Sequence, residues 1–325
     1  MKPKILIVGN AVVGSNILDL LGKQLELIKI DSSELLSNTT NLKDVSALWI
    51  HFDTFLDKSF LNKISHIPYL ISTTTGLTHI SKEIQDHYGT KLISLRNRIS
   101  LLSKVTSTAE HAWSLIMHWN NNLSEAFNSV EKGNWERKKF FRHQQLSGRT
   151  LGVIGFGRLG KMVANFGVAF KMNVFIYEIE SEAIKQAENS NFKVVKSLGD
   201  LFTDSDIVSI NASYNVGDEP IITKEVLSSI KKSILLVNTA RAGLVNEQSI
   251  IEEINRRPFL YYYTDVLSCE ENGTNLRNSE IWKFSIQSER IKITPHVGGA
   301  NLEAAMLCES ELLNEFLKRI GLQDK

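Results

Sequence analysis

Three side chains whose chemistry suits proton transfer and acid binding follow apolar runs in the second half of the chain. Arg241 comes after ILLVN, Glu270 after FLYYYTD, and His296 after IKIT. A guanidinium binds a carboxylate through two parallel hydrogen bonds, and an imidazole titrates near neutral pH, where it exchanges protons with a hydroxyl or carbonyl oxygen. A buried carboxylate beside the imidazole would orient it and raise its pKa. Each residue alone also fits a structural role, as a surface ion pair or a turn histidine, whereas the set indicates a catalytic cleft.

A glycine-rich turn lies between the apolar run Leu151–Ile154 and a predicted helix that begins KMVANF. Gly155, Gly157 and Gly160 have the spacing G-x-G-x-x-G, in which the glycines allow a tight turn, the approach of a pyrophosphate and close packing of the helix. Glu178 follows the next apolar run, near the roughly 20-residue separation expected of an acid that binds the ribose diol. Because a carboxylate there repels a 2′-phosphate, the pattern favours NAD (NADH) over NADP. The alternatives are an ordinary strand-to-helix turn and a surface glutamate.

Apolar runs with little polar alternation recur along the chain and predict buried parallel strands. The first group is Ile5–Val8, Leu25–Ile30, Ala47–Ile50, Tyr69–Ser72 and Lys91–Leu95, and the second is Leu151–Ile154, Asn173–Tyr177, Asp206–Ile210, Ile234–Asn238, Phe259–Asp265 and Ile291–Thr294. We predict an α/β protein with two Rossmann-like domains on doubly wound parallel sheets, whose ligands bind at the carboxyl ends of the strands. A helix over Thr106–Leu123 is expected to join the domains. The turn Gly9–Gly14 is interpreted as structural, since it lacks the middle glycine.

The composition argues against several classes of function. A chain of 325 residues is long enough for about two domains, and 42% hydrophobic residues suffice for sizeable cores. The net charge of +1 gives no electrostatic reason to expect nucleic acid or an anionic membrane as a partner. Cys269 and Cys308, without a C-x-x-C motif, argue against a disulfide framework or a cysteine-rich zinc site, and no metal is expected. No apolar stretch approaches the roughly 20 residues of a membrane span, so we expect a cytoplasmic protein that acts on a small molecule.

Several segments together resemble the D-isomer-specific 2-hydroxyacid dehydrogenases. They are LGVIGFGRLG, NTARAGLVNE, Asp265–Glu270 and TPHVGG, with further similarity in STAEH (Ser107–His111) and GNWERKKFFRHQQLSGRT. The resemblance implies a nucleotide domain inserted into a flavodoxin-like substrate domain that is built from both chain ends. We therefore expect an NAD-binding Rossmann domain at residues 106–296 and a substrate or catalytic domain at residues 1–105 and 297–325. The resemblance also implies a homodimer through the nucleotide domain, and a phosphoglycerate dehydrogenase-like short form without a regulatory C-terminal domain.

The resemblance assigns roles to individual residues. Arg241 would bind the substrate carboxylate and keto oxygen, His296 would act as general acid and base, and Glu270 would hold His296. In the segment TTGLTH, which begins at Thr74, backbone amides would bind the same carboxylate. The predicted substrate-binding residues are Thr74, Thr75, Gly76, Arg241 and His296. The predicted cofactor-binding residues are Gly155, Gly157, Arg158, Leu159, Gly160, Glu178, Asn211, Thr239, Ala240, Asp265 and Gly298.

The implied activity is hydride transfer between nicotinamide and C2 of a small D-2-hydroxy acid or 2-keto acid, by an NAD-dependent D-2-hydroxyacid dehydrogenase. Phosphoglycerate dehydrogenase proper is an alternative, since Arg96, Arg98 and Lys104 follow a strand and would bind a phosphate if they faced the cleft. A solvated loop is the other interpretation of these basic residues. An NADH-sensing interaction protein, similar to the family's transcriptional corepressors, is an alternative of another class. Asn211-Ala212-Ser213 and Thr74-Thr75 differ from the family pattern, which leaves the substrate open.

Overall fold

The chain divides into two compact units. A computed structural model describes residues 2–9, 25–36, 42–52, 54–141, 144–271 and 275–322. Unit 1 comprises Met1–Val105 and Asn301–Lys325, and unit 2 comprises Thr106–Ala300. Unit 2 ends at Ala300 rather than at the expected His296, because the residues after His296 are tied to unit 2. The backbone amides of Val297 and Gly298 both donate hydrogen bonds to Asp265 of that unit.

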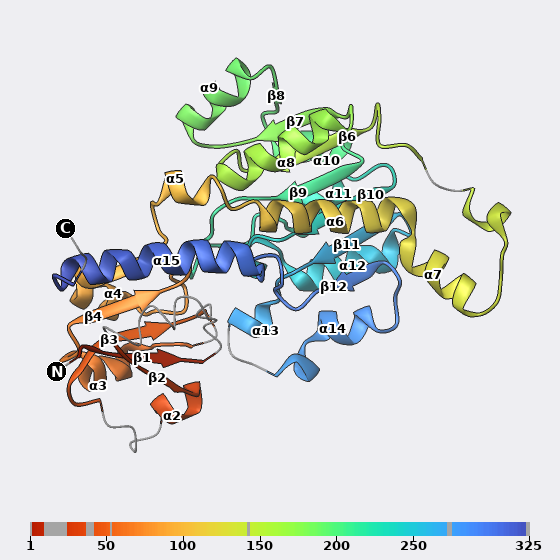
Figure 1. Ribbon diagram of the computed structural model, residues 1–325. Helices are drawn as coiled ribbons and strands as arrows, with labels where there is room; N and C mark the ends of the chain where they lie inside the picture. The colour runs from red at the N-terminus through yellow and green to blue at the C-terminus, as the bar shows by residue number, and fades with distance from the viewer. Residues whose placement is uncertain are drawn as a thin grey trace. The chain divides into compact units, whose positions relative to one another are not determined.

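Unit 1 is built on a parallel sheet with apolar residues on both faces. Within the described residues its strands are β1 (Lys4–Val8), β2 (Glu26–Ile30), β3 (Val45–Ile50), β4 (Tyr69–Ser72) and β5 (Leu92–Ser94), in the order β2-β1-β3-β4-β5 (Figure 1). This order is that of flavodoxin-like doubly wound sheets. Ile5 and Ile7 of β1 join one core cluster and Leu6 and Val8 join another, as expected where successive side chains point to opposite faces. Burial on both faces explains why the sequence of β1 is an uninterrupted apolar run.

In the described part of unit 1, short helices and one long helix cover the sheet. They are α2 (Ser32–Leu36), η1 (Lys58–Phe60), α3 (Leu61–Ile64), α4 (Lys82–Tyr88), η2 (Gly89–Lys91), α5 (Ile99–Leu102) and α15 (Leu302–Arg319). The Asn301 side chain accepts a hydrogen bond from the Ala304 amide and so caps α15. α15 buries Leu312 and Phe316 in the same cluster as Ile5, so the end of the chain completes the core of its beginning (Figure 1). Of the predicted turn Gly9–Gly14, residues 10–14 lie outside the described part of the chain.

Unit 2 is built on a longer parallel sheet. Its described strands are β6 (Thr150–Ile154), β7 (Asn173–Tyr177), β8 (Lys193–Val194), β9 (Ile207–Ile210), β10 (Ile234–Asn238), β11 (Leu260–Thr264) and β12 (Ile291–Ile293), in the order β12-β11-β10-β9-β6-β7-β8. If the strands are numbered from β6, the order from β8 to β11 is the Rossmann order 3-2-1-4-5-6, and β12 adds a seventh strand beside β11. The order reverses between β6 and β9, and ligands of open α/β sheets bind at such a switch point. The predicted α/β class with two doubly wound sheets is confirmed.

Helices cover both faces of this sheet. The described ones are α6 (Ser107–Asn121), α7 (Leu123–Glu131), η3 (Arg137–Phe140), α8 (Arg158–Ala169), α9 (Ser181–Asn189), α10 (Leu198–Asp204), α11 (Lys224–Ser228), η4 (Ala242–Leu244), α12 (Glu247–Arg256), α13 (Ser268–Glu271), η5 (Leu276–Asn278) and α14 (Glu280–Ser285). One core cluster packs α6 and α8 against β6 through Ile116, Val163 and Val153. The other packs α10 and α12 on the opposite face through Leu201 and Ile250. Covered faces again account for the apolar strands.

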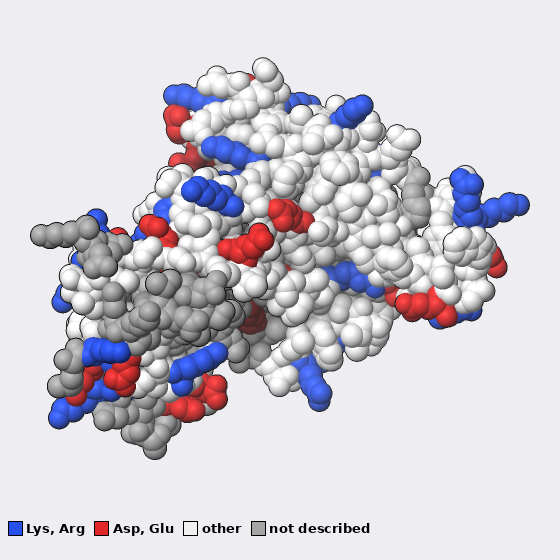
Figure 2. Space-filling view, viewed as in Figure 1, with Lys and Arg blue, Asp and Glu red and all other residues white. Residues whose placement is uncertain are grey.

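The helix predicted over Thr106–Leu123 ends earlier than expected. Asn122 adopts a left-handed conformation with φ of +45°, which ends α6 and lets α7 begin at Leu123. The chain thus continues from α6 into α7, and η3 follows at Arg137–Phe140. No helix in the described part of the chain is long and apolar enough to cross a membrane. On the face shown in Figure 2, Lys and Arg side chains of the described residues are interspersed with Asp and Glu.

Candidate active site

The glycine-rich turn joins β6 to α8, and packing explains two of its three glycines. Gly155 has φ of +86°, in the left-handed region that favours glycine, and a Cβ there would lie 2.9 Å from the backbone of Ala212. A Cβ on Gly160 would overlap the carbonyl oxygen of Gly155. A Cβ on Gly157, by contrast, would meet no atom within 4 Å. The outer glycines are thus required by the fold itself, and the middle glycine borders open space.

The amino end of α8 faces the same turn. Gly157 is its N-cap residue, and the predicted cofactor residues Arg158 and Leu159 form its first turn. Leu159 packs against the core cluster of α6 and α8, while Arg158 is half-buried. The first amides of a helix have no partner within the helix and carry the positive end of its dipole, so they bind anions. This arrangement has the space and the polarity that a pyrophosphate needs.

Glu178 stands directly after β7 and is tied to the glycine-rich turn. Its Oε2 accepts a hydrogen bond from the amide of Phe156 at 2.6 Å. Its Oε1 accepts bonds from the amides of Ile179 at 2.7 Å and Glu180 at 3.0 Å. These three bonds fix the carboxylate beside the turn, where an acid would also accept hydrogen bonds from a ribose diol.

The remaining strand ends bring further predicted cofactor residues to the same edge of the sheet. Asn211 follows β9, where its amide donates to the carbonyl of Ile154 at 2.8 Å, across the switch point. Its side-chain Nδ2 donates to the backbone oxygen of Ser209 at 3.1 Å. Thr239 and Ala240 follow β10, and both are buried. Asn211 therefore lies beside the glycine-rich turn, and the other two lie one strand further along.

A buried asparagine shapes the turn that carries Arg241. The Asn238 side chain accepts a hydrogen bond from the amide of Ala240 at 3.0 Å and donates one to the carbonyl oxygen of Arg241 at 2.9 Å. The Nη1 atom of Arg241 donates to the carbonyl oxygen of Ala240 at 2.7 Å. An Asn side chain that bonds its own turn in this way fixes the backbone on both sides of it. The half-buried guanidinium of Arg241 consequently projects from a rigid base.

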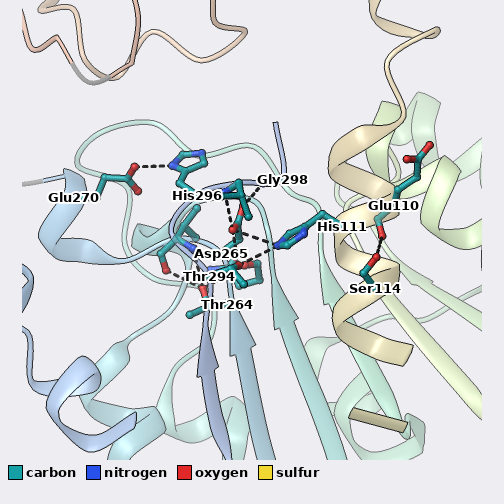
Figure 3. Close-up of polar contacts among 12 residues, drawn as sticks. Glu110, His111, Ser114, Thr264, Asp265, Glu270, Thr294, His296 and Gly298 are labelled. Atoms are coloured by element: carbon teal, nitrogen blue, oxygen red, sulfur yellow. Dashed lines mark hydrogen bonds and ion pairs between the residues drawn. The ribbon is translucent and has the colours of Figure 1, made fainter. Parts of the chain in front are cut away.

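Glu270 and His296 are in direct contact. The Nδ1 atom of His296 lies 2.7 Å from Oε1 of Glu270, and both side chains are partly exposed (Figure 3). Glu270 belongs to α13, whose first residue is anchored to Glu247 of α12. The amide and the hydroxyl of Ser268 donate to the two carboxylate oxygens of Glu247, at 2.9 Å and 2.6 Å. The carboxylate that faces the histidine is thus carried by a helix with a fixed starting point.

Asp265, directly after β11, is the most heavily bonded side chain of this region. Its Oδ1 accepts from the hydroxyl of Thr294 at 2.5 Å and from the amide of Val297 at 2.9 Å, and its Oδ2 accepts from the amide of Gly298 at 2.7 Å (Figure 3). His111 of α6 approaches Oδ1 to 3.3 Å. Burial raises the pKa of Asp265, but the hydrogen bonds from His111, Thr294, Gly298 and Val297 outweigh it and hold the pKa below its usual range. Asp265 is therefore a buried carboxylate, and its hydrogen bonds organise the TPHVGG segment.

The backbone of His296 has an uncommon conformation. Its φ is +52°, in the left-handed region that residues other than glycine rarely adopt. The amide of His296 donates to the backbone oxygens of Asp265, at 2.9 Å, and Thr294, at 3.0 Å. Backbone strain of this kind persists where surrounding bonds enforce it, and it is concentrated at functional sites.

The predicted catalytic residues share one sheet edge. Arg241 follows β10 and His296 follows β12, with β11 between them. Strands two positions apart are separated by about 10 Å, a span that a small acid and its two binding groups can fill. Among the described residues no group of His, Cys, Asp and Glu side chains is arranged to hold a metal ion.

The predicted substrate loop belongs to unit 1 and is closed by its own side chains. The Thr74 hydroxyl donates to the carbonyl oxygen of Gly76 at 2.6 Å and lies 2.9 Å from the hydroxyl of Ser72. Ser72 is buried and also lies 3.2 Å from Nε2 of His79. Thr75 is exposed at the tip of the loop.

One member of the basic run has structural partners. Arg98 donates to the carbonyl oxygen of Ser94 at 2.8 Å and pairs with Glu311 of α15 at 3.3 Å. Arg96 and Lys104 are exposed. The pairing of Arg98 supports the interpretation of this run as a surface segment of unit 1.

Sequence reasoning gave no site role to three residues that hold the predicted ones in place: Asn238, Thr294 and His111. An asparagine at the end of a strand just before a turn is a recognisable signal for a side chain that bonds its own backbone. Thr294 and His111 carry no such local signal, because they meet only through the fold.

A Rossmann sheet with a glycine-rich turn, an acid after its second strand and a histidine–carboxylate pair at its carboxyl edge defines a nucleotide-dependent oxidoreductase. Residues 113–298, more than half of the chain, match the family described as "D-isomer specific 2-hydroxyacid dehydrogenase, NAD binding domain". The chain belongs to this family, and it is an NAD-binding oxidoreductase. The predicted family, cofactor and enzyme class are confirmed.

Relatives and solved structures agree with this membership. The chain is 26% identical over 281 residues to a hydroxypyruvate reductase of Thermotoga maritima, covering 86% of this chain and 87% of that protein. The identity to a D-3-phosphoglycerate dehydrogenase of Methanocaldococcus jannaschii is also 26% over 281 residues, but this match covers only 50% of that protein's length. A phosphoglycerate oxidoreductase from Vibrio cholerae shares the fold with a TM-score of 0.79 and 22% identity, covering 99% of this chain and 100% of that one. A D-lactate dehydrogenase from Aquifex aeolicus, solved with NAD and lactic acid, has a TM-score of 0.76 and 21% identity, covering 98% and 96%.

Proposed function

We propose that this protein moves a hydride between the nicotinamide of NAD and C2 of a small D-2-hydroxy acid or the corresponding 2-keto acid. The observation that carries the proposal is the 2.7 Å contact between His296 Nδ1 and Glu270 Oε1, at the sheet edge that also bears Arg241 and the glycine-rich turn. A histidine oriented by a carboxylate suits proton exchange with an alcohol or carbonyl oxygen. A guanidinium on the same edge suits a substrate that carries a carboxylate.

The residues around the turn fit NAD. Gly157 leaves open space at the amino end of α8, which suits a pyrophosphate, and Glu178 places a carboxylate where a ribose diol would donate to it. A carboxylate at that position also disfavours a 2′-phosphate, so NADH is preferred over NADPH. When bound, the nicotinamide supplies or accepts the hydride.

The protein side chains handle the proton and the position of the substrate. Because Nδ1 of His296 faces Glu270, the proton that the C2 oxygen gains or loses is carried at Nε2. The contact with Glu270 selects one orientation of the imidazole ring. Arg241 binds the carboxylate and polarises the neighbouring carbonyl oxygen, which makes C2 a better hydride acceptor.

In this proposal the two units have different roles. Unit 2 binds the nucleotide and carries Arg241, Glu270 and His296, and unit 1 is the substrate domain. The loop Thr74–Gly76 of unit 1 offers backbone amides for the substrate carboxylate. Its hydroxyl bonds from Thr74 to Gly76 and Ser72 support a fixed loop shape.

A screen of 2-keto acids with NADH and NADPH tests the proposal. Glyoxylate, hydroxypyruvate, pyruvate and phosphohydroxypyruvate are each mixed with enzyme and cofactor, and loss of reduced-cofactor absorbance is followed. We expect turnover with at least one unphosphorylated acid and with NADH in preference to NADPH. Reduction of phosphohydroxypyruvate alone would instead favour phosphoglycerate dehydrogenase. Binding of NADH without reduction of any keto acid would refute the proposal in favour of an NADH-sensing protein.

Two alanine variants supply the matched test of the site. Arg241→Ala and His296→Ala are each expected to lower kcat/KM by at least about 100-fold, since each removes a group that acts on the transition state. Both should retain the fold and NADH binding, because neither residue lies in the glycine-rich turn. Near-normal turnover by either variant would contradict the assigned roles.

We also propose that the protein is a cytoplasmic homodimer that associates through unit 2. The segment that carries α7 and η3 exposes aromatic side chains that a monomer would leave in water, namely Phe127 (64% exposed), Trp135 (87%) and Phe141 (72%). Cys269 and Cys308 are both buried and form no disulfide bond, which suits a reducing compartment. Light scattering should show a dimer for the wild type and a monomer for Trp135→Glu. Val168→Glu, at another exposed apolar position of unit 2, should remain dimeric.

A further inference from the structure

The two points where the chain passes between the units lie close to one hydrogen-bonded cluster of unit 2. α6 begins at Ser107, just after the boundary at Val105, and the TPHVGG segment ends just before the boundary at Ala300. His111 of α6 meets Thr294, the first residue of that segment, and Asp265, which follows β11 (Figure 3). The contact joins residues 183 positions apart in sequence.

The hydrogen bonds of the cluster run in one direction. The hydroxyl of Thr294 has a single proton, and at 2.5 Å it donates that proton to Oδ1 of Asp265. The same hydroxyl lies 3.0 Å from Nε2 of His111, so it accepts a hydrogen bond there and the Nε2 atom carries a proton. The chain of donors from His111 through Thr294 ends on a carboxylate, and bonds that polarise one another in series are stronger than isolated ones.

The cluster also sets the backbone that follows His296. The amides of Val297 and Gly298 donate to the two oxygens of Asp265, at 2.9 Å and 2.7 Å. A Cβ on Gly298 would lie 2.9 Å from Oδ2 of Asp265 and 3.4 Å from Cδ2 of His111, so this glycine lets the three residues pack closely. The Asp265 side chain is 1% exposed and that of His111 19%, which places the contact largely out of water.

We propose that His111 is a positioning residue for His296. His111 orients the hydroxyl of Thr294 and the carboxylate of Asp265, and that carboxylate holds the amides after His296, so the left-handed turn directs the imidazole toward the substrate. His111 itself does not touch substrate or cofactor in this proposal. Only the expected effect on kinetics rests on the proposed function, because the structural part of the inference concerns the hydrogen bonds of the turn.

Four variants and a control test the proposal. His111→Leu and Thr294→Val remove the polar atoms of the chain, whereas His111→Gln and Thr294→Ser keep a donor or a hydroxyl at the same place. Ser114→Ala is the control, because it removes an exposed hydrogen bond of the same helix, from Ser114 to the carbonyl oxygen of Glu110, outside the cluster (Figure 3).

The first measurement needs no activity. Hydrogen exchange followed by mass spectrometry on peptides that cover residues 294–299 reports how well the amides of Val297 and Gly298 are held. We expect exchange about 10-fold faster or more in His111→Leu and Thr294→Val, and exchange close to wild type in the two conservative variants and in Ser114→Ala. Unchanged exchange in both disruptive variants would overturn the proposal, whether or not a substrate has been found.

The second measurement is steady-state kinetics with the best keto acid from the screen. Misplacement of a reacting group by about 1 Å costs on the order of 100-fold in rate, so kcat should fall about 10- to 100-fold in the disruptive variants. The KM for NADH should stay within about twofold, and the conservative variants should recover most of kcat. Equal loss in disruptive and conservative variants, or equal loss of kcat and NADH binding, would overturn the positioning role. A wild-type enzyme that reduces no keto acid would refute the proposed function, and the exchange measurement would still decide whether His111 holds the turn.

Discussion

Substitution of the glycines in the turn between β6 and α8 separates a packing role from a binding role. At Gly157 an added Cβ meets no protein atom within 4 Å, and its φ of −73° is accessible to alanine. At Gly160 an added Cβ overlaps the carbonyl oxygen of Gly155, whose own position is fixed against Ala212. Gly157→Ala should therefore leave the free protein unchanged, and Gly160→Ala should damage it.

The expected magnitudes follow from these contacts. Overpacking in a close-packed region costs about 1–3 kcal/mol, so Gly160→Ala should lower the free energy of unfolding by about that amount. Gly157→Ala should change it by less than about 0.5 kcal/mol, as for a surface substitution that meets nothing. Its Cβ, however, takes the space of the bound pyrophosphate. A hydrogen bond to a charged group contributes about 1.5–3 kcal/mol, and loss of one such bond weakens NADH binding about 10- to 150-fold.

Two assays read these effects independently. Urea unfolding gives the stability of each variant without cofactor, and NADH fluorescence titration gives Kd. The expected pattern is wild-type stability with weak binding for Gly157→Ala, and reduced stability with weak binding for Gly160→Ala. If Gly157→Ala bound NADH as tightly as the wild type, the amino end of α8 would not be the pyrophosphate site, and the cofactor would have to be placed elsewhere.

Three further substitutions test other parts of the site. Glu270→Gln removes the negative charge 2.7 Å from Nδ1 of His296, and kcat/KM should fall about 10- to 100-fold with NADH affinity unchanged; a change below about threefold would contradict the role of the carboxylate. Glu178→Ala removes the acid that would bind the ribose diol, so the ratio of kcat/KM for NADH to that for NADPH should fall at least about 10-fold; an unchanged ratio would locate cofactor selectivity elsewhere. In Asp265 the folded-state pKa lies below the unfolded one, so the ionised carboxylate stabilises the fold above about pH 4 and that stability is lost as pH falls through the folded pKa. In urea, Asp265→Asn should therefore have a lower free energy of unfolding than the wild type at pH 7, and this difference should narrow below pH 4. A difference that does not change with pH would contradict the stabilising role of the ionised carboxylate.

The fold was largely predictable because its strands are buried on both faces. β4 and β7 have the predicted bounds, Tyr69–Ser72 and Asn173–Tyr177. The predicted run Lys91–Leu95 was one residue longer at each end than β5, Leu92–Ser94. β8 was missed, since Lys193 and Val194 form a strand too short and too exposed at the sheet edge to leave an apolar run. α7 was missed because its boundary with α6 depends on one left-handed residue, Asn122.

The site was predictable as far as strand ends could locate it. Parallel strands bring their carboxyl ends to one edge, which placed Glu270 and His296 together, and the structure puts them in contact. The roles of Thr294 and His111 were not predictable, because a contact across 183 residues has no signature in either segment alone. The family resemblance predicted that Asp265 binds the cofactor, and this stays a prediction. The structure adds that Asp265 holds the backbone after β12 through the amides of Val297 and Gly298.

The left-handed backbone of His296 explains why its turn needs so many hydrogen bonds. A residue with a side chain costs on the order of 1–2 kcal/mol in this conformation, and a glycine would avoid the cost but would bring no imidazole. A hydrogen bond to a charged acceptor contributes about 1.5–3 kcal/mol, so the two amides that donate to the Asp265 carboxylate together exceed the strain. The amides of Val297 and Gly298 now use both carboxylate oxygens of Asp265, whereas a neutral asparagine at this position has a single side-chain oxygen. One of the two amides would therefore lose its acceptor. The geometry of the proposed acid–base group thus depends on a buried charge that need not touch the substrate at all.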